Sequence, residues 1–122
     1  MKNCFAIRGA TTLSIDSPVE MDAAVDELFE QILQRNALEV EDIAYVILSQ
    51  TPDLRTKNAA TSLRRTGKCD DVPLFCVQEA DISGALPLAI RVLVLVNHPV
   101  QKEPRMVYLR KAASLRPDYE EE

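Results

Sequence analysis

The chain has 122 residues, of which 47% are hydrophobic and 27% are charged, and these values are typical of one soluble globular domain. Its 14 Lys and Arg residues against 19 Asp and Glu residues give a net charge of −5, which argues against a general attraction to nucleic acid or anionic lipid. The longest apolar run, Val92–Val96, is far shorter than a membrane span, and the N-terminus lacks the apolar stretch of a secretory signal. We expect a single cytoplasmic domain over residues 1–122, with no nucleic-acid or membrane partner.

Cysteine and histidine usage restricts the possible chemistry. The three cysteines, Cys4, Cys69 and Cys76, are odd in number and share no C-x-x-C spacing, so we expect free thiols. His98 is the only histidine, which excludes a multi-histidine metal site or a mechanism with two imidazoles within one chain. The phosphate-binding and metalloprotease motifs are also missing. We expect neither a metal nor a cofactor.

A strand followed by a long helix is predicted for the first part of the chain. Residues 3–8 alternate as a strand does, and the strand is expected to end at Arg8. Ser17 is a suitable N-cap, Pro18 suits the first helical position, and Glu20 completes a capping box. The helix is expected to end at Asn36. Its core-facing stripe consists of Val25, Leu28, Phe29, Ile32 and Leu33.

The rest of the chain predicts four strands and a short helix. The β-branched run Ile43–Ser49 predicts a strand that stops before Thr51-Pro52, and residues 57–65 predict a short helix closed by Gly67. Three further strands are expected at Val72–Val77, Leu88–Asn97 and Met106–Arg110. These elements make an α+β domain with a mixed sheet, one face of which is too apolar to be left in water, so we expect the chain to oligomerise.

Arg91 interrupts an apolar strand and therefore needs a partner. One interpretation is an internal salt bridge, for example to Glu79, and the other is an anionic ligand. Arg8, at the end of the first strand, could offer a carboxylate two parallel hydrogen bonds. Glu79 and Cys76 are three residues apart, which puts them on opposite faces of an ideal strand. Tyr108, taken alone, is most simply a core or interface tyrosine.

Seven fragments resemble the monofunctional AroH-class chorismate mutases, in the same order and with nearly uninterrupted spacing. They are Ile7-Arg8-Gly9-Ala10-Thr11-Thr12, Thr51-Pro52-Asp53-Leu54, Val72-Pro73, Gln78-Glu79, Ile90-Arg91-Val92, Val107-Tyr108-Leu109 and Leu115-Arg116-Pro117-Asp118. The resemblance implies a chorismate-mutase-type, ferredoxin-like subunit in a homotrimer with a pseudo-α/β-barrel core and active sites between subunits. It also implies the Claisen rearrangement of chorismate to prephenate in phenylalanine and tyrosine biosynthesis, without cofactor or covalent catalysis.

The resemblance assigns roles to individual residues. Arg91 would donate to the ether oxygen as it gains negative charge, Arg8 would hold a substrate carboxylate, and Glu79 would engage the ring hydroxyl. These three are the expected catalytic residues. The remaining substrate contacts would come from Arg64 of the neighbouring subunit and from Cys76, Tyr108, Leu115 and Arg116. Residues 115–122 would form a mobile tail over the site.

Three positions depart from the family's usual pattern. Asn58 and Thr61 stand where members usually have phenylalanine and lysine, and Phe75 stands where they usually have threonine. The neighbouring subunit's wall of the site would consist of Asn58, Thr61, Leu74 and Phe75. Without the lysine, substrate binding would weaken unless Lys57 or Arg55 reaches the site.

Two other functions remain as alternatives to a mutase. One is a similar trimeric fold, that of the RidA-like imine deaminases, which also bind carboxylates between subunits. The other is a catalytically silent trimer that binds a carboxylated metabolite. A sensor has no use for a cation directed at a breaking ether bond, so Arg91 together with Glu79 favours the mutase.

Overall fold

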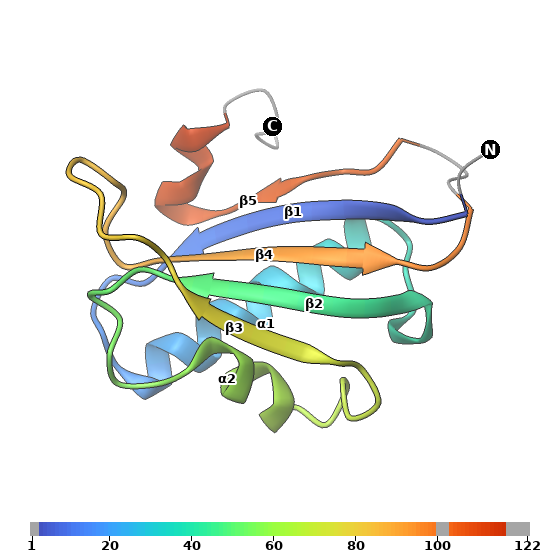
Figure 1. Ribbon diagram of the computed structural model, residues 1–122, viewed down its shortest axis with the longest axis horizontal. Helices are drawn as coiled ribbons and strands as arrows, with labels where there is room; N and C mark the ends of the chain where they lie inside the picture. Colours follow the sequence, from blue (N-terminus) through green and yellow to red (C-terminus); the bar gives the residue numbers. More distant parts are fainter. Residues whose placement is uncertain (1–2, 100–102, 117–122) are drawn as a thin grey trace.

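The computed structural model describes residues 3–99 and 103–116, and these contain one mixed sheet with two α-helices (Figure 1). The strands are β1 (Phe5–Thr12), β2 (Ile43–Gln50), β3 (Leu74–Gln78), β4 (Ala89–Val96) and β5 (Val107–Tyr108). The α-helices are α1 (Pro18–Arg35) and α2 (Ala59–Arg65), and the 3-10 helices are η1 (Val40–Asp42) and η2 (Arg110–Leu115). The expected α+β class, with a five-stranded mixed sheet, a long helix and a short helix, is confirmed.

The strands lie in the order β3-β2-β4-β1-β5. β4 is antiparallel to both of its neighbours, whereas β5 is parallel to β1 and β3 is parallel to β2. The expectation of a ferredoxin-like subunit is wrong in one respect. α2 lies between β2 and β3, so the chain does not follow the β-α-β-β-α-β order of that fold.

Local sequence accounts for the start and end of α1. The Ser17 hydroxyl accepts a hydrogen bond from the Glu20 backbone N–H at 3.1 Å, and Pro18 occupies the first turn, as predicted. The predicted capping box is not closed, because the Glu20 carboxylate accepts instead from the Ser14 backbone and hydroxyl at 3.1 and 2.8 Å. Asn36 is the C-cap, and its side-chain amide donates to the Ile32 carbonyl.

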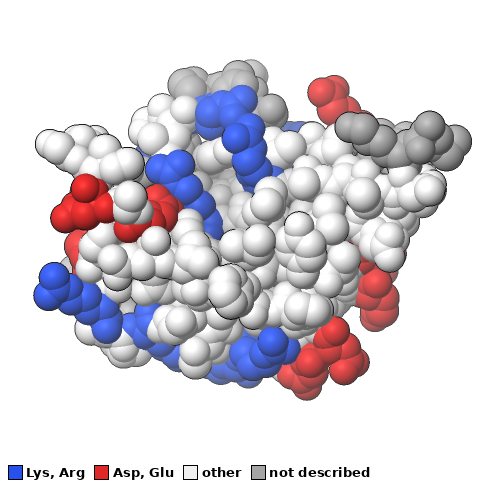
Figure 2. All heavy atoms as spheres, in the orientation of Figure 1, with Lys and Arg blue, Asp and Glu red and all other residues white. Residues whose placement is uncertain are grey.

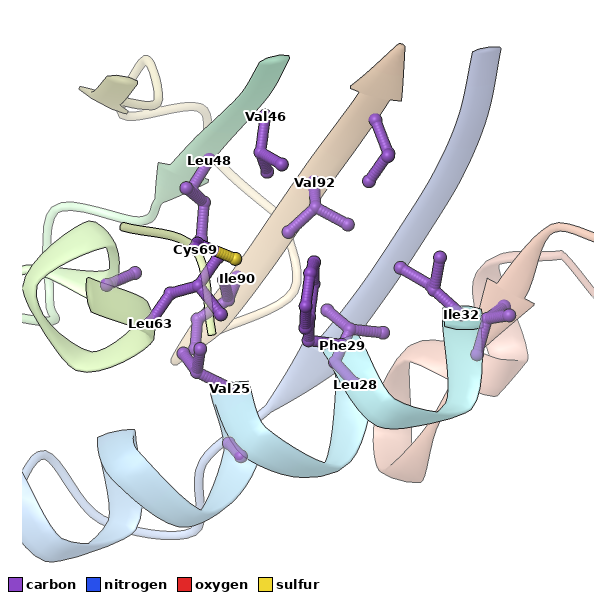
Figure 3. Packing of buried hydrophobic residues seen from close by; sticks show 14 of the residues in the cluster. Val25, Leu28, Phe29, Ile32, Val46, Leu48, Leu63, Cys69, Ile90 and Val92 are labelled. Atoms are coloured by element: carbon purple, nitrogen blue, oxygen red, sulfur yellow. The ribbon is translucent and has the colours of Figure 1, made fainter. Parts of the chain in front are cut away.

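The apolar stripe of α1 packs against one face of the sheet. The predicted stripe is confirmed, except that Leu33 is only partly buried. Figure 3 shows side chains of this stripe packed against residues of β2 and β4. Leu63 of α2 and Cys69 pack beside them. The labelled residues are Val25, Leu28, Phe29, Ile32, Val46, Leu48, Leu63, Cys69, Ile90 and Val92. Burial of this face is the main stabilising contribution that a single chain can make to its own fold.

β1 continues four residues beyond its predicted end at Arg8. It pairs with β4 as far as Thr12, which lies opposite Ala89. Gly9 does not end the strand, because its pairing opposite Val92 of β4 continues, and α1 packs closely against the sheet at this point. A Cβ atom at Gly9 would lie 3.0 Å from the Val107 carbonyl oxygen and 3.1 Å from Ile32.

Other predicted boundaries shift by a few residues. α2 begins at Ala59 rather than residue 57, β3 begins at Leu74 rather than residue 72, and β4 loses one residue at each end. The last strand is shorter than predicted, because Arg110 adopts a left-handed φ of 53° and starts η2 instead of continuing β5. Gly67 closes α2 with a φ of 76°, as expected. The proposed tail lies mostly outside the described residues, since only Leu115 and Arg116 are described.

Among the described residues, no helix lies in front of β2 and β4 on the opposite face of the sheet (Figure 1). Several apolar side chains are exposed here, including Phe75 at 65%, Val77 at 40% and Tyr45 at 36%. Figure 2 shows this face as uncharged over its centre, with basic side chains reaching in from the upper left and acidic side chains beside them. We call this surface the open face. Separately, no helix in the described part of the chain is long and apolar enough to cross a membrane.

Candidate active site

Three predicted site residues come together at one end of the open face. Arg8, Arg91 and Tyr108 line a hollow of about 250 Å³ with Ser49, which the sequence interpretation missed. Strand register explains the grouping, because Arg91 lies opposite Ser49 on one side and Ala10 on the other, and Ala10 lies opposite Tyr108. Side chains in such a row point to the same face of a sheet, so four strands supply one site.

Arg91 is paired within the chain, as one of its two interpretations proposed. Its Nε atom lies 3.3 Å from Oε2 of Glu79, and the Ser49 hydroxyl donates to the same oxygen at 2.6 Å. The Arg91 side chain is 48% exposed and that of Glu79 is 21% exposed. Among the described residues, the terminal nitrogens of Arg91 have no hydrogen-bond partner. The salt bridge therefore leaves part of the guanidinium fork available for an anion.

Arg8 adds a second cation to the same hollow. Its guanidinium makes no hydrogen bond or ion pair to any residue in the described ranges, although its backbone N–H contacts the Met106 sulfur at 3.0 Å. Two guanidinium groups beside one hollow repel each other unless an anion lies between them. The hollow is therefore electrostatically suited to a small molecule with negative charge.

Cys76 and Glu79 lie on opposite faces of the sheet, as their spacing predicts. The Glu79 backbone N–H donates to the Gln50 carbonyl at 2.9 Å and extends the β2–β3 ladder, and its carboxylate lies on the open face. The Cys76 thiol instead contacts the side-chain oxygen of Gln50 at 3.4 Å, toward α2. Within one chain, the thiol of Cys76 and the carboxylate of Glu79 therefore do not face the same hollow.

The expected neighbouring-subunit residues form a separate surface. Thr61, Arg64 and Leu74 line a shallow hollow between α2 and β3, whereas Phe75 points to the open face. Asn58 is the N-cap of α2 and accepts hydrogen bonds from two backbone N–H groups. We call Asn58, Thr61, Arg64 and Leu74 the α2 wall. It does not share a hollow with Arg91, so within one chain the two groups of predicted site residues lie on different surfaces.

Arg64 is engaged by the loop that follows α2. Its guanidinium donates to the carbonyls of Cys69, Asp70 and Val72. This arrangement holds the loop that leads into β3 and uses three of the five N–H donors of the guanidinium.

Neither of the two cations considered as substitutes for the missing lysine faces the hollow between α2 and β3. Lys57 is bonded to Asp22 of α1 at 2.7 Å, and the Arg55 guanidinium contacts the Pro52 carbonyl at 3.4 Å. The hydrogen bond from Lys57 holds the pKa of the Asp22 carboxyl below its usual value.

The C-terminal segment lies near the hollow on the open face. The Arg116 guanidinium lies 6.0 Å from the centre of the Tyr108 ring, at the outer limit of a cation–π contact. Leu115 is 37% exposed at the end of η2. Arg116 is therefore close enough to Tyr108 to border the same site.

Groups that nucleophilic or metal chemistry would need are not assembled in the described part of the chain. Burial raises the pKa of the Cys69 thiol, which keeps it protonated and unreactive. In residues 3–99 and 103–116, no cluster of three or more His, Cys, Asp or Glu side chains could hold a metal ion. The chemistry that the described site offers is hydrogen bonding and positive charge.

Comparison with known proteins identifies the family to which the chain is similar. The family model for chorismate mutase type I matches residues 4–119. The chain is 40% identical over 113 residues to chorismate mutase AroH of Bacillus subtilis (strain 168), covering 92% of this chain and 89% of that protein. It is also 40% identical over 116 residues to chorismate mutase AroH of Thermus thermophilus, covering 93% of this chain and 94% of that protein.

A solved structure agrees at the level of the fold. A chorismate mutase from Clostridium thermocellum superposes with a TM-score of 0.83 and 34% sequence identity, covering 90% of this chain and 98% of that chain. These findings do not favour the imine deaminase or the silent binding module. The chain belongs to the chorismate mutase type I family.

Proposed function

We propose that this chorismate mutase converts chorismate to prephenate in a site formed between two copies of the chain. The observation that carries the proposal is the pair of arginines, Arg8 and Arg91, which face one hollow and retain unused hydrogen-bond donors. Chorismate carries two carboxylates, so it supplies negative charge beyond that of the Glu79 carboxylate, which is paired with Arg91. By its family membership the enzyme acts in phenylalanine and tyrosine biosynthesis, which we assign to the cytoplasm.

The proposed mechanism needs no nucleophile, because the Claisen rearrangement is unimolecular. As the ether bond breaks, its oxygen gains negative charge, and the Arg91 guanidinium stabilises that charge more than it stabilises the substrate. Arg8 and Tyr108 hold the carboxylates, and Glu79 accepts a hydrogen bond from the ring hydroxyl. Holding the enolpyruvyl arm over the ring removes conformational freedom, which lowers the barrier further.

Glu79 has a second role in this proposal. Its Oε2 atom accepts from both Ser49 and Arg91, at 2.6 and 3.3 Å. This shared acceptor limits rotation of the guanidinium before substrate binds, so less reorganisation is needed in the transition state. The two interpretations of Arg91, as an internal salt bridge and as a ligand-binding cation, are therefore compatible.

The second half of the site comes from the α2 wall of a neighbouring subunit. Two observations support this assembly: the two groups of predicted site residues lie on different surfaces of one chain, and the open face leaves large apolar side chains exposed. A homotrimer with a pseudo-α/β-barrel core would cover that face and bring Arg64, Cys76 and Phe75 toward the neighbouring hollow. Leu115 and Arg116 would border the bound substrate.

A subunit-mixing assay tests both the reaction and the shared site. Purified chain should consume chorismate, followed by its ultraviolet absorbance, whereas the Arg91→Ala and Arg64→Ala chains should each be impaired. If the two variants are unfolded, mixed in equal amounts and refolded together, about one quarter of the interfaces should combine an intact Arg91 with an intact Arg64. Recovered turnover supports the shared site. No recovery, with mixed oligomers demonstrated by differential tagging, contradicts it.

A further inference from the structure

Gln50, the last residue of β2, uses its whole side-chain amide to join three segments. The amide nitrogen donates to the carbonyls of Leu54 and Lys57 at 3.0 and 3.1 Å. The amide oxygen accepts from the Ala59 backbone N–H at 2.8 Å and from the Cys76 thiol at 3.4 Å. An amide can donate twice and accept twice, so all four of its hydrogen-bonding positions are used.

The contact with Ala59 completes the N-terminal cap of α2. The Ala60 and Thr61 backbone N–H groups donate to the Asn58 side chain at 2.8 and 3.3 Å, while the Ala59 N–H donates to Gln50. A helix of seven residues is too short to be stable by itself, so its position depends on such anchors. Asn58 caps the helix from within the same loop, whereas Gln50 ties the helix to the sheet.

Gln50 also forms hydrogen bonds with β3 and with the residue that follows it. Its side chain contacts the Cys76 thiol on the side of α2, and its backbone carbonyl accepts from the Glu79 N–H at 2.9 Å. Gln50 follows Val46 and Leu48 on the buried side of β2, so its amide lies between α2 and β3 rather than in the substrate hollow. It does not line the hollow of Arg91, and so it can act on substrate only through other residues.

We propose that Gln50 is a positioning residue that fixes the distance between α2 and β3 and thereby sets the affinity for substrate. The inference rests on the proposed role of the α2 wall. Thr61 and Arg64 lie on one side of the gap that Gln50 spans, and Leu74 and Cys76 lie on the other. A substrate held between these two sides loses contacts when their spacing becomes variable.

The expected kinetic signature is a change in KM rather than in kcat. The wall contacts parts of the substrate that do not change charge during the reaction, so it contributes nearly equally to the ground state and the transition state. Removal of such uniform binding raises KM and leaves kcat almost unchanged. We expect Gln50→Ala to raise KM by about tenfold and to change kcat by less than about threefold.

The test compares three variants at a temperature well below their thermal midpoints. Gln50→Ala removes the amide and leaves space, Gln50→Met removes the hydrogen bonds but keeps the length, and Gln34→Ala is the control on the exposed surface of α1. A raised KM in Gln50→Met with an unchanged KM in Gln34→Ala supports the proposal, even if Gln50→Ala does not fold. A lowered melting temperature with unchanged KM overturns it and leaves Gln50 with a structural role alone.

Arg64→Ala, measured in the same series, separates this inference from the site on which it rests. If Arg64→Ala raises KM and Gln50→Met does not, the α2 wall binds substrate and the positioning role is wrong. If neither variant changes KM, both the positioning role and the proposed wall are wrong. A fall in kcat of Gln50→Met at constant KM also overturns the proposal, because it would mean that Gln50 acts on the transition state.

Discussion

Ile90 and Arg91 are neighbours on β4, and their side chains lie on opposite faces of the sheet. Ile90 is 0% exposed and packs into the core under α1, whereas the Arg91 side chain is 48% exposed beside Glu79. The core-facing side of β4 contains only apolar residues, and the open face combines apolar side chains with the charges of the site. The first face stabilises the chain without a partner. In the proposed function the second face is covered by a ligand and a second subunit, so assembly and catalysis would depend on the same surface.

The largest expected effect comes from Arg91→Ala. Loss of the cation that faces the breaking ether bond should lower kcat by about 10³-fold or more, which corresponds to about 4 kcal/mol of transition-state stabilisation. The melting temperature should change little, because the side chain is half exposed. Steady-state turnover and thermal unfolding measured on the same preparation check this. Unchanged kcat would remove Arg91 from the mechanism, and unfolding would mean that its salt bridge is structural.

Ile90→Ala should give the opposite pattern. Removing a fully buried isoleucine should lower the free energy of unfolding by about 2–5 kcal/mol, through lost burial and the cavity left behind. Because the charges of the site are untouched, kcat per folded molecule should stay within about threefold of the original. Denaturant unfolding measures the first effect, with Ile82→Ala at an exposed position as the control. If kcat falls as far as in Arg91→Ala, the two faces are not functionally separate.

Much of the difference between the core-facing side of the sheet and the open face could be predicted from the sequence. The spacing of apolar residues in residues 18–35 and the Ser17-Pro18 start specify α1, because both signals are local. The continuation of β1 past Gly9 could not be predicted, since it depends on pairing with β4, which lies about 80 residues away in sequence. Ser49 and Gln50 were missed for the same reason. Each is an ordinary polar residue at the end of a strand, and its partners Glu79 and Cys76 come from β3 and the residue after it.

Leu95→Asp tests whether the open face is covered in solution. Leu95 lies on that face opposite Ala6 and Tyr45, four residues from Arg91 along β4. A carboxylate buried among apolar side chains is strongly unfavourable, so the variant should sediment as a monomer and lose activity. Val19→Asp places the same charge on the exposed surface of α1 and should keep the original oligomeric state. Unchanged sedimentation of Leu95→Asp would show that the interface lies elsewhere.

Thr61→Lys tests the other half of the site with a smaller expected gain. The side chain of Thr61 lines the hollow between α2 and β3, and a lysine there adds a cation beside Arg64. If this wall faces the substrate carboxylates, KM should fall by about threefold to tenfold with little change in kcat. Thr61→Gln, of similar length but uncharged, should not reproduce the gain. Equal KM values for all three chains would argue that the wall does not approach the substrate's charges.

The smallest expected effect lies far from the open face, in the ion pair between Asp22 of α1 and Lys57, which lies two residues before α2. The bond to Lys57 lowers the pKa of the Asp22 carboxyl in the folded state below the unfolded value of about 3.9. The pair therefore stabilises the fold fully above that pH, and its contribution is lost as the pH falls through the lower, folded-state pKa. At pH 7, Asp22→Asn should lower the free energy of unfolding by about 0.5–1 kcal/mol, a small value because the pair is partly exposed. The difference in unfolding free energy between the variant and the original chain should shrink below about pH 4. Asp71→Asn, at an exposed carboxylate without an ion pair among the described residues, should show no such dependence. If the loss of unfolding free energy in Asp22→Asn does not depend on pH, packing and not charge holds α2 against α1.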